Sequence, residues 1–105
     1  MYTMDPRRVD LQNLLEAALG TANVYFQPPE NNEIQYPCIV YHREFTETEF
    51  ADDRPYHHNL RYQVTVIDRN PDSDIPRKIR DLPKCRHVRF FTAHDLNHDV
   101  FTLVF

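Results

Sequence analysis

Glycine and serine are nearly absent from this chain, which has one glycine, Gly20, and one serine, Ser73. A Walker A loop and a GxGxxG dinucleotide-binding loop each need several glycines, so neither occurs here. The GxSxG elbow of serine hydrolases needs glycines beside its nucleophile, whereas Ser73 lies between Asp72 and Asp74. These two counts exclude many phosphate-binding, dinucleotide-binding and serine-hydrolase functions.

Cysteine is also scarce: Cys38 and Cys85 are the only two, and they form no CxxC pair. Such cysteines are typical of reduced thiols in a cytoplasmic chain rather than of a redox motif or a zinc site. No apolar run approaches the roughly 18 residues that a membrane span requires. The start of the chain lacks the cationic and apolar regions of a signal peptide. We therefore expect a chain that is made in the cytoplasm and does not enter a membrane.

Positive charge is in deficit, because 16 acidic residues outnumber 12 lysines and arginines and give a net charge of −4. A dedicated nucleic-acid-binding protein is usually basic overall, so this balance argues against one. The 105 residues suit a single domain, residues 1–105, and seven Phe and six Tyr supply large side chains for its core.

The first predicted element is an amphipathic helix between Asp5 and Gly20. Asp5 is a helix-capping residue type, Pro6 suits the first helical position, and Gly20 suits the position after the last turn. Leucine and alanine recur between them with helical spacing, so one face of this helix is expected to cover the core. The stripe consists of Leu11, Leu14, Leu15 and Ala18, widened by Leu19.

A second, short helix is predicted behind the turn at Asn70-Pro71. A polar residue within 72–74 is able to cap this helix, and Pro83 ends it. Its apolar stripe consists of Ile75, Ile79 and Leu82.

Alternating and continuous apolar segments predict five strands. They span residues 23–27, 38–50, 56–69, about 85–93 and about 98–105. The segments 38–50 and 56–69 flank the turn ADDRP and are expected to form a hairpin long enough to protrude. The order α-β-β-β-α-β-β predicts an α+β fold, with a mainly antiparallel sheet and both helices packed on one face.

The motif HDLNHD, residues 94–99, is the strongest apparent metal site in the sequence. His94 and His98 are zinc-type ligands, and the neighbouring aspartates add carboxylates. Because the two histidines bracket a turn between strands, the interpretation that we favour is a polar hairpin turn with exposed histidines. A small metal-dependent enzyme that uses His94, His98 and a carboxylate is the alternative.

Cys85 and His87 lie two positions apart on a predicted strand, so their side chains are able to share a face. This arrangement imitates a Cys–His nucleophile pair, but the sequence places no oxyanion hole or orienting acid beside it. Two neighbouring side chains on a strand face are the favoured interpretation.

Charge is segregated along the chain. The charged residues in 44–53 are all acidic. In 77–89 the charged residues are all basic apart from Asp81. The acidic residues are Glu44, Glu47, Glu49, Asp52 and Asp53, and the basic ones are Arg77, Lys78, Arg80, Lys84, Arg86 and Arg89. Between neighbouring copies these two regions predict a heterologous, head-to-tail subunit interface. Two solvated surfaces are the alternative.

Three segments carry a resemblance to a known family: NVYFQPPENNEIQYPCIVY, RYQVTVIDRNPDSDIPRKIRDLPKC and HDLNHDVFTLVF. They resemble the small tail-completion or tail-terminator proteins of long-tailed, siphovirus-like phages and prophages. The similarity extends from about residue 9 to the end of the chain. Its more specific parts are the run YQVTVIDRNPDS and the closing NHDVF.

The resemblance implies a structural virion protein that forms a ring, expected to be hexameric, at the head-proximal end of the tail tube. There it would end tube growth and contact the tail tube protein and the head-tail connector proteins. DNA would pass through the lumen without specific binding. The resemblance implies no catalytic residues, cofactor or metal. Other connector proteins of the neck, the stopper and the adaptor, remain an alternative, as does a monomeric binding module.

Overall fold

The computed structural model describes residues 6–28, 33–44, 50–51, 54–55 and 60–105. In chain order the elements are α1 (Pro6–Leu19), β1 (Val24–Phe26), β2 (Cys38–Arg43), β3 (Phe50–Ala51), β4 (Arg54–Pro55), β5 (Arg61–Asp68), α2 (Ile75–Arg80), β6 (Cys85–Ala93) and β7 (Leu96–Val104). Neither helix in these residues has the length and apolar character needed to cross a membrane.

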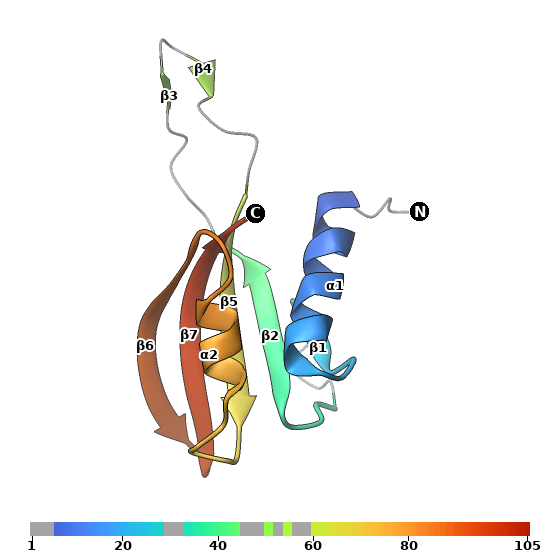
Figure 1. The fold of residues 1–105 in the computed structure, drawn as a ribbon, viewed down its shortest axis with the longest axis vertical. Coiled ribbons are helices and arrows are strands. Elements are labelled where there is room, and N and C mark those ends of the chain that lie inside the picture. The colour runs from blue at the N-terminus through green and yellow to red at the C-terminus, as the bar shows by residue number, and fades with distance from the viewer. Residues whose placement is uncertain (1–5, 29–32, 45–49, 52–53, 56–59) are drawn as a thin grey trace.

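Five strands form the main sheet in the order β1-β2-β5-β7-β6, and both helices lie against one face of it (Figure 1). β1 runs parallel to β2, whereas the other three neighbouring pairs are antiparallel. The helices and main-sheet strands follow each other as α-β-β-β-α-β-β. The predicted α+β fold and its element order are therefore confirmed.

The segments predicted as two long strands contribute Cys38–Arg43 and Arg61–Asp68 to the main sheet. The short strands β3 and β4 pair with each other in a separate sheet, which lies beyond the end of the main sheet (Figure 1). The residues that connect this pair to β2 and β5 lie outside the described part of the chain. The predicted continuous hairpin is therefore described only at its base and at β3 and β4.

Helix α1 begins at Pro6 and ends at Leu19, directly before Gly20, as the sequence predicted. Gly20 has a φ of 89°, and its amide donates to the carbonyl of Glu16 at 2.8 Å. A positive φ is strained for residues with a Cβ, so glycine suits this helix end. The predicted cap Asp5 lies outside the described residues.

The hydrophobic core lies between the helices and one face of the main sheet. The helices contribute Leu11, Leu15, Leu19, Ile75 and Ile79, and the strands contribute Val24, Ile39, Tyr41, Tyr62, Val64, Val66, Phe101 and Leu103. Alternate strand residues point the other way, to what we call the helix-free face. In the pairing register, that face includes Val40, Thr65, Val100 and Arg89 in one row across the sheet.

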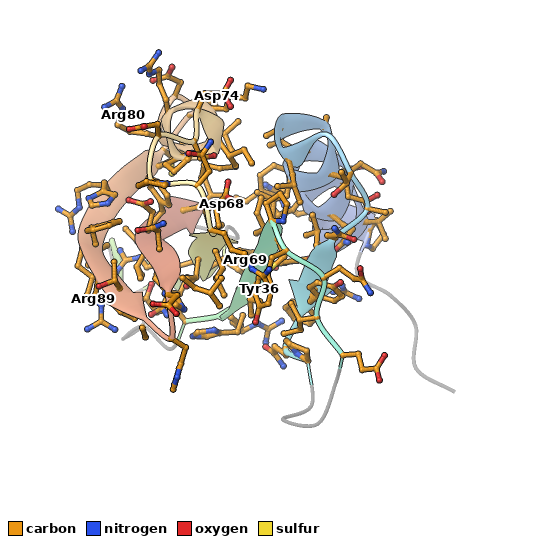
Figure 2. The ribbon with its side chains drawn as sticks, turned by 90° about the horizontal axis from the view of Figure 1, so that it is seen from below. Tyr36, Asp68, Arg69, Asp74, Arg80 and Arg89 are labelled. Carbon is orange, nitrogen blue, oxygen red and sulfur yellow. The ribbon has the colours of Figure 1, made fainter. Side chains whose placement is uncertain are left out.

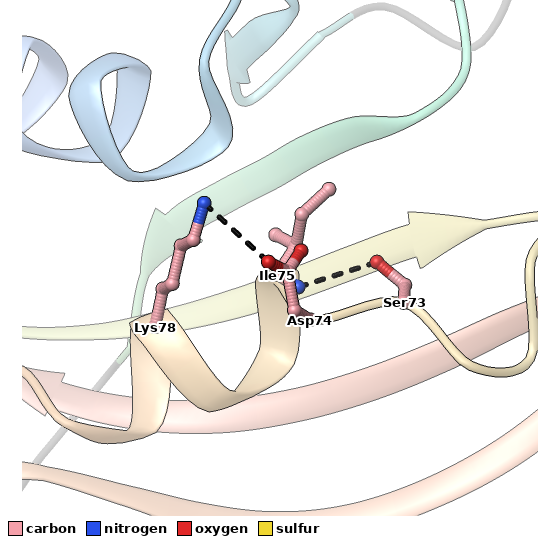
Figure 3. A network of polar contacts seen from close by, with 4 residues as sticks. All are labelled: Ser73, Asp74, Ile75 and Lys78. Atoms are coloured by element: carbon pink, nitrogen blue, oxygen red, sulfur yellow. Dashed lines mark hydrogen bonds and ion pairs between the residues drawn. The ribbon is translucent and has the colours of Figure 1, made fainter.

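The corner before α2 is held by Ser73. The Ser73 hydroxyl accepts a hydrogen bond from the Ile75 amide at 3.2 Å, while the N-cap residue Asp74 makes no capping hydrogen bond with its side chain (Figure 3). Asp74 instead lies 3.8 Å from the Lys78 ammonium group on the next turn of the helix. Ser73 therefore serves the helix start, as one of the three capping residues that the sequence offered.

The hairpin between β6 and β7 is tighter than the sequence predicted. The final strand was expected from about residue 98, but β7 begins at Leu96 and leaves only His94 and Asp95 in the turn. Their φ values are 53° and 61°, as a two-residue type I′ turn requires at both positions. The motif lacks the glycine that usually marks such a turn, so its residue types indicated a longer loop.

Candidate functional site

β6 is an edge strand of the main sheet, and in the described residues only β7 pairs with it. Its nine residues, Cys85–Ala93, therefore present one side of their backbone without a strand partner. Unpaired N–H and C=O groups along a sheet edge form a template on which another strand can pair. This edge is the candidate binding surface that the fold provides.

The pairing of β6 with β7 determines which backbone groups point outward. Antiparallel neighbours alternate between pairs that exchange hydrogen bonds and pairs that do not. The Val104 amide donates to the Lys84 carbonyl at 3.1 Å, and the two-residue turn closes on the pair Ala93–Leu96. Counted from both ends, the residues whose backbone groups face away from β7 are Cys85, His87, Phe90 and Thr92.

A β-bulge at Val88 sets the direction of the side chains on β6. The register shifts between His87 and Arg89 and leaves Val88 without an opposing residue. In a regular strand, Arg86 and Arg89 would point to opposite faces because they are three positions apart. With the bulge, both lie opposite residues of β7 that point to the helix-free face, as if they were two positions apart.

Arg89 is oriented by a stack of side chains on the helix-free face. Its guanidinium carbon lies 5.2 Å from the centre of the Phe91 ring, and the Phe91 ring stacks on His98 at 4.5 Å with an 11° angle between the planes. A guanidinium group over an aromatic face is attracted by the ring quadrupole. The Arg89 charge is thereby held above the sheet beside the free edge.

Large apolar side chains are exposed along the same strand. Val88 is 53% exposed, Phe90 54% and Phe91 38%. Water contact of such side chains costs free energy, which burial against a partner removes. β6 therefore combines free backbone groups, exposed apolar side chains and two arginines on one edge.

The structure divides the predicted basic residues between two places. Arg77, Lys78 and Arg80 lie on α2, whereas Arg86 and Arg89 point to the helix-free face. Figure 2 shows this separation for Arg80 and Arg89. The remaining predicted residue, Lys84, directly precedes β6 with a φ of 57°.

Two of the three cations on α2 have acidic neighbours, whereas Arg77, like Arg86 and Arg89, forms no ion pair with a described carboxylate. On α2, Lys78 lies 3.8 Å from Asp74 and Arg80 lies 3.7 Å from Asp81, so acidic neighbours screen both charges. Neither Arg86 nor Arg89 forms an ion pair with a carboxylate of the described residues. These two arginines are therefore available to an acidic partner.

Of the predicted acidic residues, Glu44 is described, and it lies at the end of β2. The Thr102 hydroxyl of β7 donates to the Glu44 carboxylate at 2.9 Å, and the Glu44 amide donates to the Arg61 carbonyl at 2.9 Å. Glu44 therefore has a role within its own subunit. The other predicted acidic residues, Glu47, Glu49, Asp52 and Asp53, lie outside the described residues.

His94 and His98 are not assembled into a metal-binding group. His94 occupies the turn, while the His98 ring stacks on Phe91 and its Nδ1 lies 3.2 Å from the Leu96 carbonyl oxygen. Within the described ranges, no three His, Cys, Asp or Glu side chains converge as metal ligands. His94 therefore lies in the predicted polar turn, whereas His98 lies within β7 and is half-buried, not exposed as the sequence had led us to expect.

Cys85 and His87 share the core-side face of β6, and the structure supplies the acid that the sequence did not place. The His87 Nε2 lies 3.1 Å from the Asp99 carboxylate, and its ring packs edge-on against Phe101. Burial, however, raises the pKa of the Cys85 thiol to about 11. The thiol is therefore protonated at neutral pH, whereas a nucleophilic cysteine needs a lowered pKa.

A hollow of about 510 Å³ opens at the end of the sheet where β2 begins and β5 ends, between residues 34–37 and 68–70. Tyr36 and Arg69 face each other there, with the guanidinium carbon 5.8 Å from the ring centre (Figure 2). The Asp68 carboxylate is engaged by the Asn70 amide at 2.9 Å. These contacts close the strand-to-helix corner, and no motif in the sequence predicted the hollow.

The sequence predicted the strand at residues 85–93 but not the exposure of its apolar side chains. The segment RHVRFF mixes arginines with large apolar residues in no simple alternation. That irregularity is the signal that a bulged edge strand leaves, since neither face of such a strand is fully buried.

Comparison with known proteins adds no relative: the chain matches no protein-family model, and a search of curated proteins finds no match. The function proposed for it therefore rests on the geometry of β6 and on the sequence resemblance.

Proposed function

We propose that this protein is a structural subunit of a phage tail that works by assembling with copies of itself. In this proposal it is a tail terminator or completion protein, and its ring ends the growth of the tail tube and joins tail to head. The observation that carries the proposal is the free edge of β6 with its exposed Val88, Phe90 and Phe91.

A long free edge with exposed apolar residues is a liability for a protein that stays monomeric. Such proteins usually blunt their edges with charge, bulges or covering segments. β6 has a bulge and two arginines but keeps two exposed phenylalanines. An edge that is protected in the free subunit and covered in an assembly accounts for both features.

The two edges of the main sheet differ, which favours a head-to-tail contact over a symmetric pair. β6 has nine residues and pairs antiparallel with its neighbour, whereas β1 has three and pairs parallel. An interface between two different surfaces generates a ring when its rotation closes. The sequence resemblance supplies the expected hexamer and the passage of DNA through the lumen.

Deletion of the gene from a phage that encodes this chain tests the role in the virion. Tails of uncontrolled length in electron micrographs would support termination. Tails of normal length that fail to join heads would assign the protein to the stopper or adaptor group instead. Infectious virions with normal tails would refute the proposal as a whole.

Native mass spectrometry of the purified protein tests how the ring forms. We expect the protein alone to be a monomer or a weak oligomer, because in this proposal the ring closes on the tail tube as its template. When tail tube is added, the mass of the oligomer should increase in discrete steps. A chain that stays monomeric with tube at low salt would contradict ring assembly.

A further inference from the structure

The outward backbone groups of β6 specify the shape of a partner. Cys85 and His87 present free groups on one side of the bulge, and Phe90 and Thr92 do so on the other. An extended segment laid along this edge would form main-chain hydrogen bonds with them and extend the sheet by one strand.

The side chains of β6 specify the charge of that partner. Two β6 strands placed edge to edge would bring Arg86 and Arg89 of one copy close to the same arginines of the other. Like charges opposite each other in a sheet are destabilising. Self-pairing in a register that opposes these arginines is therefore disfavoured, and a strand with carboxylates is favoured.

The bulge specifies the spacing of those carboxylates. With the bulge, Arg86 and Arg89 are as far apart along the sheet as two residues at positions i and i+2 of a regular strand. A regular strand added to this edge would therefore place acidic residues opposite both arginines if they occurred at i and i+2. Glu47 and Glu49 have this spacing, within a ten-residue run that contains no basic residue. Asp72 and Asp74 share the spacing, but Asp74 already faces Lys78 at the start of α2.

We propose that the outer edge of β6 binds the acidic segment of a neighbouring copy of this chain that contains Glu47 and Glu49, as an added strand. Arg86 and Arg89 receive the carboxylates of Glu47 and Glu49 on the helix-free face. The inference rests on the proposed self-assembly and names the contact that produces it. Phe91 contributes by holding the Arg89 guanidinium above the sheet.

A synthetic peptide of residues 44–53, capped at both ends, tests the contact on the full-length protein. Titration followed by NMR should shift the amide signals of β6, foremost those of His87, Phe90 and Thr92. The same peptide with Glu47 and Glu49 replaced by Gln should bind at least tenfold more weakly. No binding of the acidic peptide at millimolar concentration, or shifts confined to α2, would overturn the inference.

A charge exchange separates the specific contact from general attraction. The double variant Arg86→Glu/Arg89→Glu should lose at least tenfold in affinity for the acidic peptide and recover it for a peptide in which Glu47 and Glu49 are Lys. The matched control Arg77→Glu/Arg80→Glu changes the charge equally on α2 and should leave binding within about twofold. Equal losses in both variants, or no recovery, would show attraction without a defined pairing.

A change to the backbone tests strand addition itself. Thr92→Pro removes an outward N–H, which an edge position tolerates, and should weaken peptide binding, whereas Thr92→Ala should not. Equal binding by both variants would show that the peptide does not add as a strand. If the peptide binds but the deletion phage still forms normal virions, the contact at β6 is supported and only the proposed tail function is refuted.

Discussion

The hydroxyl group of Tyr41 in β2 donates a hydrogen bond to Oε1 of Gln12 in α1, across 2.5 Å. Nε2 of Gln12 in turn donates to the Val24 carbonyl of β1 and to the Glu16 carboxylate, each at 3.0 Å. One glutamine thus joins the first helix to two strands of the sheet. Tyr41 is fully buried in the core, whereas Gln12 is half-buried at the margin of the core.

Replacement of Tyr41 by Phe is expected to lower the free energy of unfolding by about 1 kcal/mol, because Gln12 Oε1 loses its donor in a partly buried place. Chemical denaturation monitored by circular dichroism measures the change. Tyr25→Phe is the matched control, since the Tyr25 hydroxyl accepts one exposed hydrogen bond from Gln35. If both variants lose the same free energy of unfolding, the hydrogen bond between Tyr41 and Gln12 does not stabilise the fold more than an exposed one.

Alkaline pH is expected to destabilise the fold through Cys38. Burial, with a smaller effect of the Asp68 charge, raises the pKa of the Cys38 thiol from 9.0 to about 12. A group whose pKa is higher in the folded state contributes stability that is complete below pH 9 and is lost as pH rises toward 12.

Denaturation curves between pH 8 and 11 measure this dependence. Cys38→Ala should reduce the slope of the free energy of unfolding against pH, at most by about 1.4 kcal/mol per pH unit. Its absolute stability will also change because a side chain is removed from the interior, so only the slopes are compared. Parallel curves for the wild type and the variant would contradict the assignment.

The turn between β6 and β7 is open to stabilisation. His94 and Asp95 both adopt positive φ, which Asn and Gly tolerate at lower cost. His94→Asn combined with Asp95→Gly should raise the free energy of unfolding by about 1 kcal/mol, measured by thermal and chemical denaturation. The control Asp95→Ala keeps a Cβ at positive φ and should give no gain. A loss on the Asn-Gly replacement would point to a role for the two native side chains.

Ser73 is expected to matter for the stability of α2. Ser73→Ala removes the acceptor of the Ile75 amide and should cost about 1 kcal/mol. Asp74→Ala should cost less, because Asp74 makes only an exposed pair with Lys78. Urea denaturation of the two variants makes the comparison. The opposite ranking would show that Asp74, and not Ser73, caps the helix in solution.

Local signals in the sequence were sufficient for the elements that depend on neighbouring residues. Pro6 and Gly20 marked the ends of α1, and the spacing of Leu11 and Leu15 identified its buried face. The α+β class followed from the order of these elements, because helices and strands must bury their apolar sides against one another. Such features depend only on residues that are close to one another in the sequence.

Only the tertiary structure decided which strand lies at the edge and where its side chains point. Edge position depends on the pairing of β5 with β7, which are separated in the sequence by α2 and β6 and which leave β6 on the outside. The bulge at Val88 then turns Arg86 and Arg89 to one face of the sheet, although residues three positions apart on a regular strand point to opposite faces. Strand pairing and register arise from long-range hydrogen bonds, so the candidate interface became visible only when the sheet was assembled.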